Sequence, residues 1–181
     1  GKALGAAWYL PNERQITTKE QMYHEMIATL GGRAAEQLIF GHISTGALSD
    51  LEKVTKQATA MIAYYGLDEK IGNRSYYDST GQQDYALTKP FSEKTAEIID
   101  EQVSKLIESA YQEALRILGE NIDGLTQLAN KLIDKEVVFG DDLEMIFGKR
   151  PWVKEEIDFP KESQQTTDNG QQSESTEENL V

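Results

Sequence analysis

Cysteine is absent from this 181-residue chain, which contains only four prolines and two histidines. The absence of cysteine excludes disulfides and thiolate metal sites. No run approaches the 18 or so consecutive apolar residues that a membrane-spanning helix needs, and no signal peptide is visible. We therefore expect the chain as given to be soluble, which leaves open a membrane anchor upstream in a longer parent protein.

Basic residues are also scarce. Lysine and arginine number 18 against 31 aspartates and glutamates, so the net charge is −13. No basic stripe suits the phosphates of a nucleic acid, and nucleic-acid binding is not expected. The chain also lacks a Gly-x-x-x-x-Gly-Lys-Ser/Thr loop, so any ATP chemistry of the protein would lie upstream.

The last part of the chain is polar and acidic. Residues 155–181 carry eight acidic residues and one basic residue. Such a segment buries too little apolar surface to offset its ordering entropy. We expect residues 154–181 to form a disordered tail and residues 1–153 to form the folded domain.

Apolar residues recur at helical spacing through most of the remaining chain. A strand is expected over residues 3–10, where Leu4, Ala6, Trp8 and Leu10 alternate with the other residues. The predicted fold class is mainly α: a bundle of four to five helices with a small β element at the N-terminus. The expected helices cover about 18–40, 47–65, 92–118 and 121–135, with a short final helix ending near Gly148 and a long loop over 66–90.

Local chemistry predicts where these helices begin and end. Two adjacent glycines, Gly31 and Gly32, cost the first helix roughly 1 kcal/mol each relative to alanine. They indicate close packing against a neighbouring element or a kink. The expected caps and stops are Thr17 with Glu20 as a capping box, Ser92, Gly119, Asn121 and Asp141.

A self-contained metal site has little support in the sequence. Zinc proteases use a His-Glu-x-x-His helix, whose spacing points two imidazoles at one ion. The nearest match begins at His24, but Ala28 occupies the second histidine position. A site built from His24, His42 and Asp50 is a second possibility, without a spacing argument behind it.

Asp50 is the most informative acidic residue. An acid in the first turn of a helix complements the helix dipole, which contributes roughly 0.3–1 kcal/mol. Spacing alone therefore favours a role at the helix end. The sequence around Asp50 changes that interpretation, because it belongs to a set of segments in a distinctive order: Ala3-Leu4-Gly5, Leu30-Gly31-Gly32-Arg33-Ala34-Ala35-Glu36, Ser44-Thr45-Gly46-Ala47-Leu48-Ser49-Asp50-Leu51, Tyr65-Gly66-Leu67, Lys89-Pro90-Phe91-Ser92 and Gly148-Lys149-Arg150-Pro151.

Over roughly residues 1–153, these segments closely resemble the peptidase domain of the FtsH family, the membrane-anchored ATP-dependent zinc metalloproteases. The resemblance implies that Asp50 is the third protein ligand of the zinc ion. It also implies that Glu36 lies near the zinc-binding histidines and orients one of them; the alternative is a surface ion pair with Arg33. The segment Leu4, Gly5, Ala6, Ala7 and Trp8 matches an edge strand along the family's cleft, which would bind extended peptides; the alternative is an internal strand.

The resemblance further implies a parent protein that degrades unfolded or membrane proteins. Its expected partners are protein substrates and five further copies in a homo-hexamer. It would act at the cytoplasmic face of the bacterial inner membrane, held there by segments upstream of this chain. The cofactors would be zinc, with one ligand here, and ATP in an upstream domain. Because the His-Glu-x-x-His helix is missing, we expect no proteolysis by this chain alone. The alternative function is a non-catalytic helical interaction or oligomerisation module.

Overall fold

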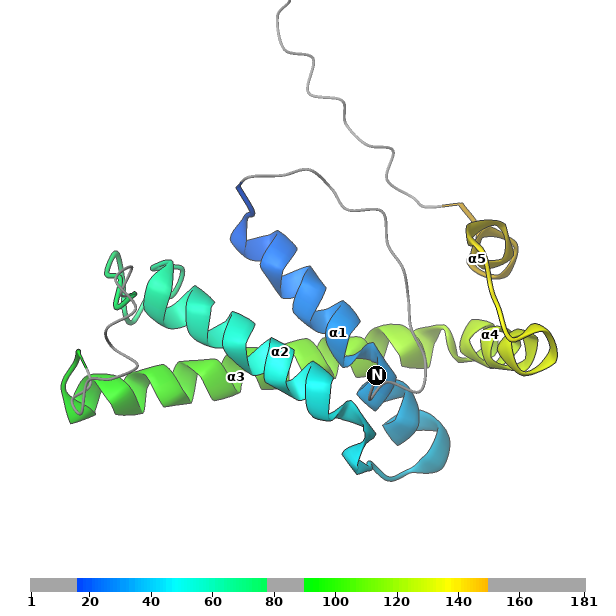
Figure 1. Ribbon diagram of the computed structural model, residues 1–181, viewed down its shortest axis with the longest axis horizontal. Helices are drawn as coiled ribbons and strands as arrows, with labels where there is room; N and C mark the ends of the chain where they lie inside the picture. The colour runs from blue at the N-terminus through cyan, green and yellow to red at the C-terminus, as the bar shows by residue number, and fades with distance from the viewer. Residues whose placement is uncertain (1–15, 78–89, 150–181) are drawn as a thin grey trace, which may run out of the picture.

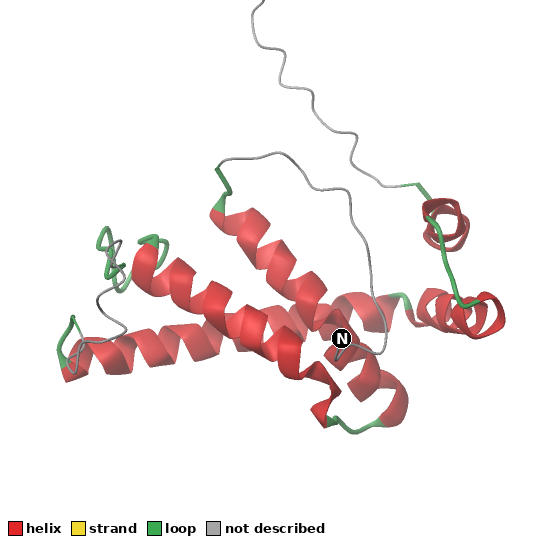
Figure 2. Ribbon diagram, viewed as in Figure 1, coloured by secondary structure: helices red, strands yellow, loops and turns green. Residues whose placement is uncertain are grey.

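The computed structural model describes residues 16–77 and 90–149, and within these ranges the chain forms helices joined by turns, without a strand (Figures 1 and 2). The predicted mainly α fold class is confirmed. The strand predicted over residues 3–10, the tail predicted over 154–181 and part of the loop predicted over 66–90 lie outside the described residues.

Five α-helices are present in the described part of the chain, close to the five predicted segments. A short 3-10 turn, η1, precedes the second helix, and a π-helical turn, η2, continues it. The elements are α1 (Lys19–Phe40), η1 (Thr45–Ala47), α2 (Leu48–Thr59), η2 (Ala60–Tyr64), α3 (Glu93–Glu120), α4 (Ile122–Lys135) and α5 (Gly140–Phe147).

The helices α1, α2 and α3 form the body of the fold. Both α1 and α2 pack against α3 and against each other, and Figure 1 shows the first two lying across the long third helix. Small side chains at the crossings allow the backbones to approach closely, because alanine adds little bulk between packed helices. The central buried cluster consists of Met26, Leu30, Ala34, Val54, Ala58, Met61, Ala110 and Ala114.

A capping box begins α1, one residue later than predicted. The Thr18 hydroxyl accepts from the Gln21 backbone N–H at 3.2 Å, and the Gln21 side chain accepts from the Thr18 N–H at 3.0 Å. The predicted pair of Thr17 and Glu20 is therefore wrong. Adjacent threonines offer the same hydroxyl in two registers, and glutamine serves as well as glutamate in such a box.

Asn121 is the N-cap residue of α4, as predicted, but its side chain caps the end of α3 and makes no cap hydrogen bond to α4. The predicted stop at Gly119 is wrong, because α3 continues to Glu120. The Asn121 side-chain amide donates to the Ile117 carbonyl at 2.8 Å, which satisfies an acceptor at the end of α3. Ser92, in contrast, caps the start of α3 as predicted, since its hydroxyl accepts from the Thr95 N–H at 3.3 Å.

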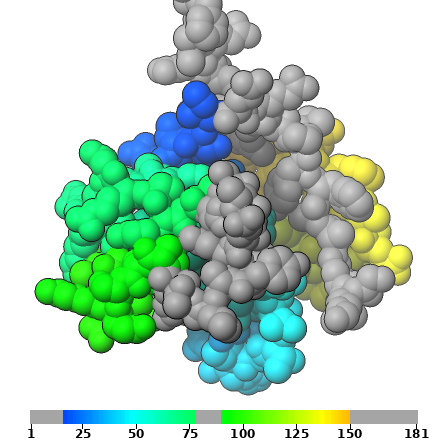
Figure 3. All heavy atoms as spheres, turned by 60° about the vertical axis from the view of Figure 1, so that its left-hand side comes forward, coloured from blue at the N-terminus to red at the C-terminus, as the bar shows by residue number. Residues whose placement is uncertain are grey.

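The last two helices pack on each other beyond the end of α3 (Figure 1). In the space-filling view, this part of the chain lies on the opposite side of the molecule from the start of α3 (Figure 3). Asp142, and not the predicted Asp141, accepts from the Phe139 N–H at 3.0 Å and pairs with Lys131. Gly124 allows the Phe147 ring to lie directly against α4, in space that a β-carbon would enter. None of the described helices combines the length and apolar character required to cross a bilayer.

Several apolar side chains remain exposed within the described part of the chain. Near the end of α1 and the start of α2, Phe40 is 66% exposed and Leu48 is 74% exposed. No described residue would meet a β-carbon at Gly31 or Gly32. The close neighbour predicted for this glycine pair is thus not among the described residues.

Replacing the buried Met26 by alanine should lower the free energy of unfolding by about 2–5 kcal/mol, because it removes a fully buried side chain and leaves a cavity. The matched control is Met145→Ala on α5, where the side chain is 72% exposed. We expect that control to change the free energy by no more than about 0.5 kcal/mol. Urea denaturation followed by circular dichroism measures both values. Equal losses from the two substitutions would contradict the described core.

Candidate functional site

Asp50 lies in the first turn of α2 and is partly buried. No side-chain hydrogen bond or ion pair joins its carboxylate to another residue in the described ranges 16–77 and 90–149. The interpretation of Asp50 as a hydrogen-bonding cap therefore finds no support among these residues, although its charge still complements the helix dipole.

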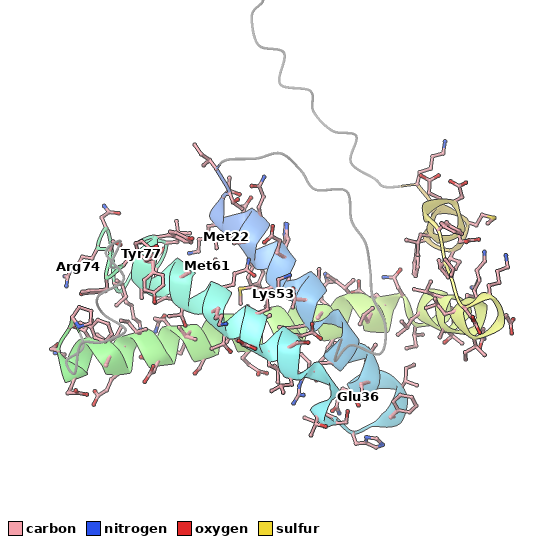
Figure 4. All side chains as sticks on the ribbon, in the orientation of Figure 1. Met22, Glu36, Lys53, Met61, Arg74 and Tyr77 are labelled. Atoms are coloured by element: carbon pink, nitrogen blue, oxygen red, sulfur yellow. The ribbon has the colours of Figure 1, made fainter. Side chains whose placement is uncertain are left out.

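Glu36 reaches from α1 to the turn that leads into α2. Its Oε2 accepts a hydrogen bond from the Ser44 backbone N–H at 3.1 Å. Figure 4 shows Glu36 toward the end of α1, beside this turn. The contact joins α1 to the turn at Ser44. Asp50 lies six residues after Ser44 in the chain.

The surroundings of Glu36 stabilise its charged form. The pKa of Glu36 is lowered below its ordinary value, first by the hydroxyl of Ser44 and then by the Ser44 backbone N–H. The nearby His42 and Arg33 contribute further lowering, while partial desolvation opposes it. A carboxylate that accepts hydrogen bonds is favoured in its ionised state. At neutral pH, Glu36 is therefore ionised and holds the turn by accepting a hydrogen bond from Ser44.

Ser44 makes hydrogen bonds with three polar groups. Its N–H donates to Glu36, its Oγ accepts from the Gly46 N–H at 3.2 Å, and its carbonyl accepts from Arg33 Nη1 at the long distance of 3.5 Å. The charge of Arg33 lowers the pKa of Glu36, but no ion pair between the two side chains is formed among the described residues. Ser44 is not among the residues predicted for the site, although a serine shortly before a glycine and a helix start is a signal for such a turn.

The two histidines do not complete a metal site with Asp50. His24 lies near the start of α1, whereas His42 follows its end and stacks on Phe40. The 16 residues of helix between positions 24 and 40 span about 24 Å. Within residues 16–77 and 90–149, no three histidine, aspartate or glutamate side chains are placed to hold one metal ion. The alternative of a site built from His24, His42 and Asp50 is therefore wrong.

The remaining site predictions fall elsewhere. The expected substrate strand, Leu4 to Trp8, lies outside the described residues. A cavity of about 190 Å³ is found near the start of α1, and its lining includes Lys19, Leu67 and Gln102. None of the residues that line it belongs to the Glu36–Ser44–Asp50 turn. The candidate site is thus an open turn with one available carboxylate.

Comparison with known proteins identifies a peptidase family. The model of peptidase family M41 matches residues 1–146. The chain is 61% identical over 153 residues to the ATP-dependent zinc metalloprotease FtsH of Parabacteroides distasonis, covering 84% of this chain and 22% of that protein. It is 56% identical over 146 residues to the protein of the same name from Karelsulcia muelleri, covering 81% and 23%.

A more distant relative is the mitochondrial ATP-dependent zinc metalloprotease FTSH 8 of Oryza sativa. It is 44% identical over 156 residues, which cover 85% of this chain and 18% of that protein. The chain therefore spans about a fifth of the length of the curated relatives it matches.

The lowered pKa of Glu36 predicts a pH-dependent contribution to stability. A depressed folded-state pKa stabilises the fold above the ordinary glutamate value of 4.5, and this contribution is lost as the pH falls through the lower folded-state pKa. The stability difference between the wild type and Glu36→Gln should thus be largest near neutral pH and shrink in acid. Urea denaturation across the pH range measures this difference.

The Ser44 amide resonance gives a direct check of the same contact. Its chemical shift should follow the protonation of Glu36 in the wild type and lose that step in Glu36→Gln. The Thr95 amide is the control, because it donates to the uncharged Ser92 hydroxyl. A Ser44 resonance that does not respond to acid would contradict the contact.

Proposed function

The chain belongs to peptidase family M41, and we propose that it forms the C-terminal part of the zinc metallopeptidase domain of an ATP-dependent endopeptidase. Family membership is supported by the match over residues 1–146 and by 61% identity to a bacterial FtsH. Because the chain spans about a fifth of such relatives, the activity belongs to a longer protein. The proposed boundaries are residues 1–153 for the peptidase part and residues 154–181 for a disordered tail.

Asp50 supplies one protein ligand to the zinc ion in this proposal. The observation that carries it is a partly buried carboxylate without another partner among the described residues, in the segment that matches the family. Carboxylate oxygens are ordinary zinc ligands. A zinc ion in a peptidase site polarises the scissile carbonyl and lowers the pKa of a bound water. The chain's own contribution is to hold one negative charge in place, which partly neutralises the cation.

Glu36 serves this site through its two carboxylate oxygens. Oε2 holds the Ser44 N–H, while no hydrogen bond to Oε1 is formed within the described ranges. We assign Oε1 to accept the ring N–H of a zinc-binding histidine supplied by the rest of the peptidase domain. Such an acceptor selects the histidine tautomer and fixes the direction of its ring.

The names of two relatives support the activity that we propose for the whole protein. The Parabacteroides and Karelsulcia proteins are called ATP-dependent zinc metalloproteases. By extension, this chain's parent uses ATP in an upstream domain, assembles as a homo-hexamer and degrades unfolded or membrane proteins. Its place is the cytoplasmic face of a bacterial inner membrane. Residues 4–8, outside the described part, are assigned to bind extended substrate as an edge strand.

A second candidate function is a helical interaction module without chemistry. The observation that favours it is the set of exposed apolar residues on the last two helices and between them, including Ile133, Phe139 and Met145. Exposed apolar patches mark interaction surfaces. The two functions are compatible, since a peptidase part can also carry assembly contacts, but only the first assigns a role to Asp50.

In the full-length protease, Asp50→Ala should abolish proteolysis and remove most of the bound zinc, while ATP hydrolysis persists, because a three-ligand site loses one of its ligands. The matched control is Asp123→Ala, which removes an acid from the first turn of α4. That control should retain zinc and protease activity. Zinc content by atomic absorption and cleavage of casein are the measurements. Full activity in Asp50→Ala would return Asp50 to a helix-dipole role.

The 181-residue chain alone should not cleave casein, because its described residues hold no complete three-ligand site and its sequence lacks a His-Glu-x-x-His helix. The assay compares the chain with the full-length protease, each with and without a zinc chelator. Cleavage by the chain that the chelator inhibits would contradict the proposal that it supplies only one ligand.

A further inference from the structure

We propose that Ser44 is a positioning residue for Asp50, in that it fixes the start of α2 and thereby the direction of the Asp50 carboxylate. This inference rests on the proposed function, in which Asp50 is a zinc ligand. Ser44 itself does not touch the metal. It acts through the backbone of the turn and together with Glu36, whose carboxylate accepts from the Ser44 N–H.

The start of α2 has no side-chain cap of its own. Its N-cap residue is Ala47, which cannot accept a hydrogen bond through its side chain. Upstream of it, the Ser44 hydroxyl caps η1 by accepting from the Gly46 N–H. η1 ends at Ala47 and α2 begins at Leu48. Because no residue separates them, the orientation of η1 determines the direction in which the helix carrying Asp50 starts.

Ser44 is held by α1 as well as by its own turn. Its backbone is extended, with φ −121° and ψ −173°, and its N–H points to the Glu36 carboxylate. Ala47, which is only 6% exposed, fixes the other end of η1 by burial. The hydrogen bonds of Ser44 with Glu36, Gly46 and Arg33, together with the buried Ala47 methyl group, therefore define the turn before Asp50.

A purely structural role for this cap predicts a different outcome from a positioning role. Ser92 caps α3 with the same chemistry, since its hydroxyl accepts from the Thr95 N–H at 3.3 Å, close to the 3.2 Å between Ser44 and Gly46. No proposed ligand lies on α3. Removing either hydroxyl should therefore cost similar stability, but only the loss at Ser44 should change how firmly the metal is held.

The experiment uses the zinc-loaded full-length protease that contains this chain. The variants are Ser44→Ala, Ser44→Asn and Ser92→Ala, with Asp50→Ala as the reference for a lost ligand. Zinc release to a chromogenic chelator is followed over time. The absorption spectrum of the cobalt-substituted protein reports on the coordination geometry. ATP hydrolysis and thermal unfolding show whether each variant is assembled and folded.

Ser44→Ala should release zinc about fivefold faster, the factor expected when one capping hydrogen bond is lost. Its cobalt spectrum should also shift. Ser44→Asn restores an acceptor, because asparagine caps helices as well as serine does, and should return the release rate to within about twofold of the wild type. Ser92→Ala should match the wild type in both metal readouts while losing comparable thermal stability.

Two outcomes separate this inference from the proposed function. If Asp50→Ala keeps its zinc, the proposed function is wrong. If Asp50→Ala loses zinc while Ser44→Ala behaves like the wild type in both metal readouts, only the positioning role is overturned. Should Ser44→Ala not fold, Ser44→Gly provides the same test, because glycine retains most of the stability of an N-cap but offers no side-chain acceptor.

Discussion

The hydrogen bond from the Ser44 backbone N–H to the Glu36 carboxylate connects the packed body of the protein to its candidate site. On one side of this contact, α1 is held against α3 by Met26, Leu30 and Ala34, all fully or almost fully buried. On the other side, the turn passes through Ser44 and η1 into α2. The Asp50 carboxylate, in the first turn of α2, is thereby positioned by packed helices. A metal ligand requires such rigid support.

Helical periodicity was sufficient to predict the fold class and the five helices. Apolar residues that recur every three to four positions depend only on which face of each helix is buried. The helix ends were less predictable. At α1, the capping box lies one residue later than predicted. The sequence allows both positions, because two threonines are adjacent and a glutamine can replace the glutamate. Asn121 was predicted to cap α4, yet its amide bonds backwards to the end of α3. The register of the capping box and the partner of the Asn121 side chain both depend on local backbone geometry, which residue spacing does not determine.

The candidate site was predicted from sequence only in part. Asp50 and Glu36 were selected through resemblance to a family and not through spacing, and their roles remain proposals. The hydrogen bond between Glu36 and the Ser44 backbone could not be predicted, because every residue type other than proline has the same backbone donor. The expected alternative, an ion pair between Arg33 and Glu36, follows from helical spacing alone, but the fold directs both side chains toward the turn instead.

The exposed apolar residues fit a chain that functions as part of a larger peptidase. Phe40 and Leu48 lie beside the candidate site, and a buried nitrogen of Gln102 has no hydrogen-bond partner among the residues that the structure describes. Both features are costly in an isolated domain, because they leave apolar surface in water and a polar group unsatisfied. They are expected where further elements of the parent pack against these helices, which is also where the remaining zinc ligands would come from.

The most direct test of the central claim is the anomalous diffraction of zinc in crystals of the intact, zinc-loaded protease. The account predicts a single strong anomalous peak within bonding distance of an Asp50 carboxylate oxygen, with Glu36 still bonded to the Ser44 N–H. A zinc peak coordinated entirely by other residues, with Asp50 facing solvent, would contradict it.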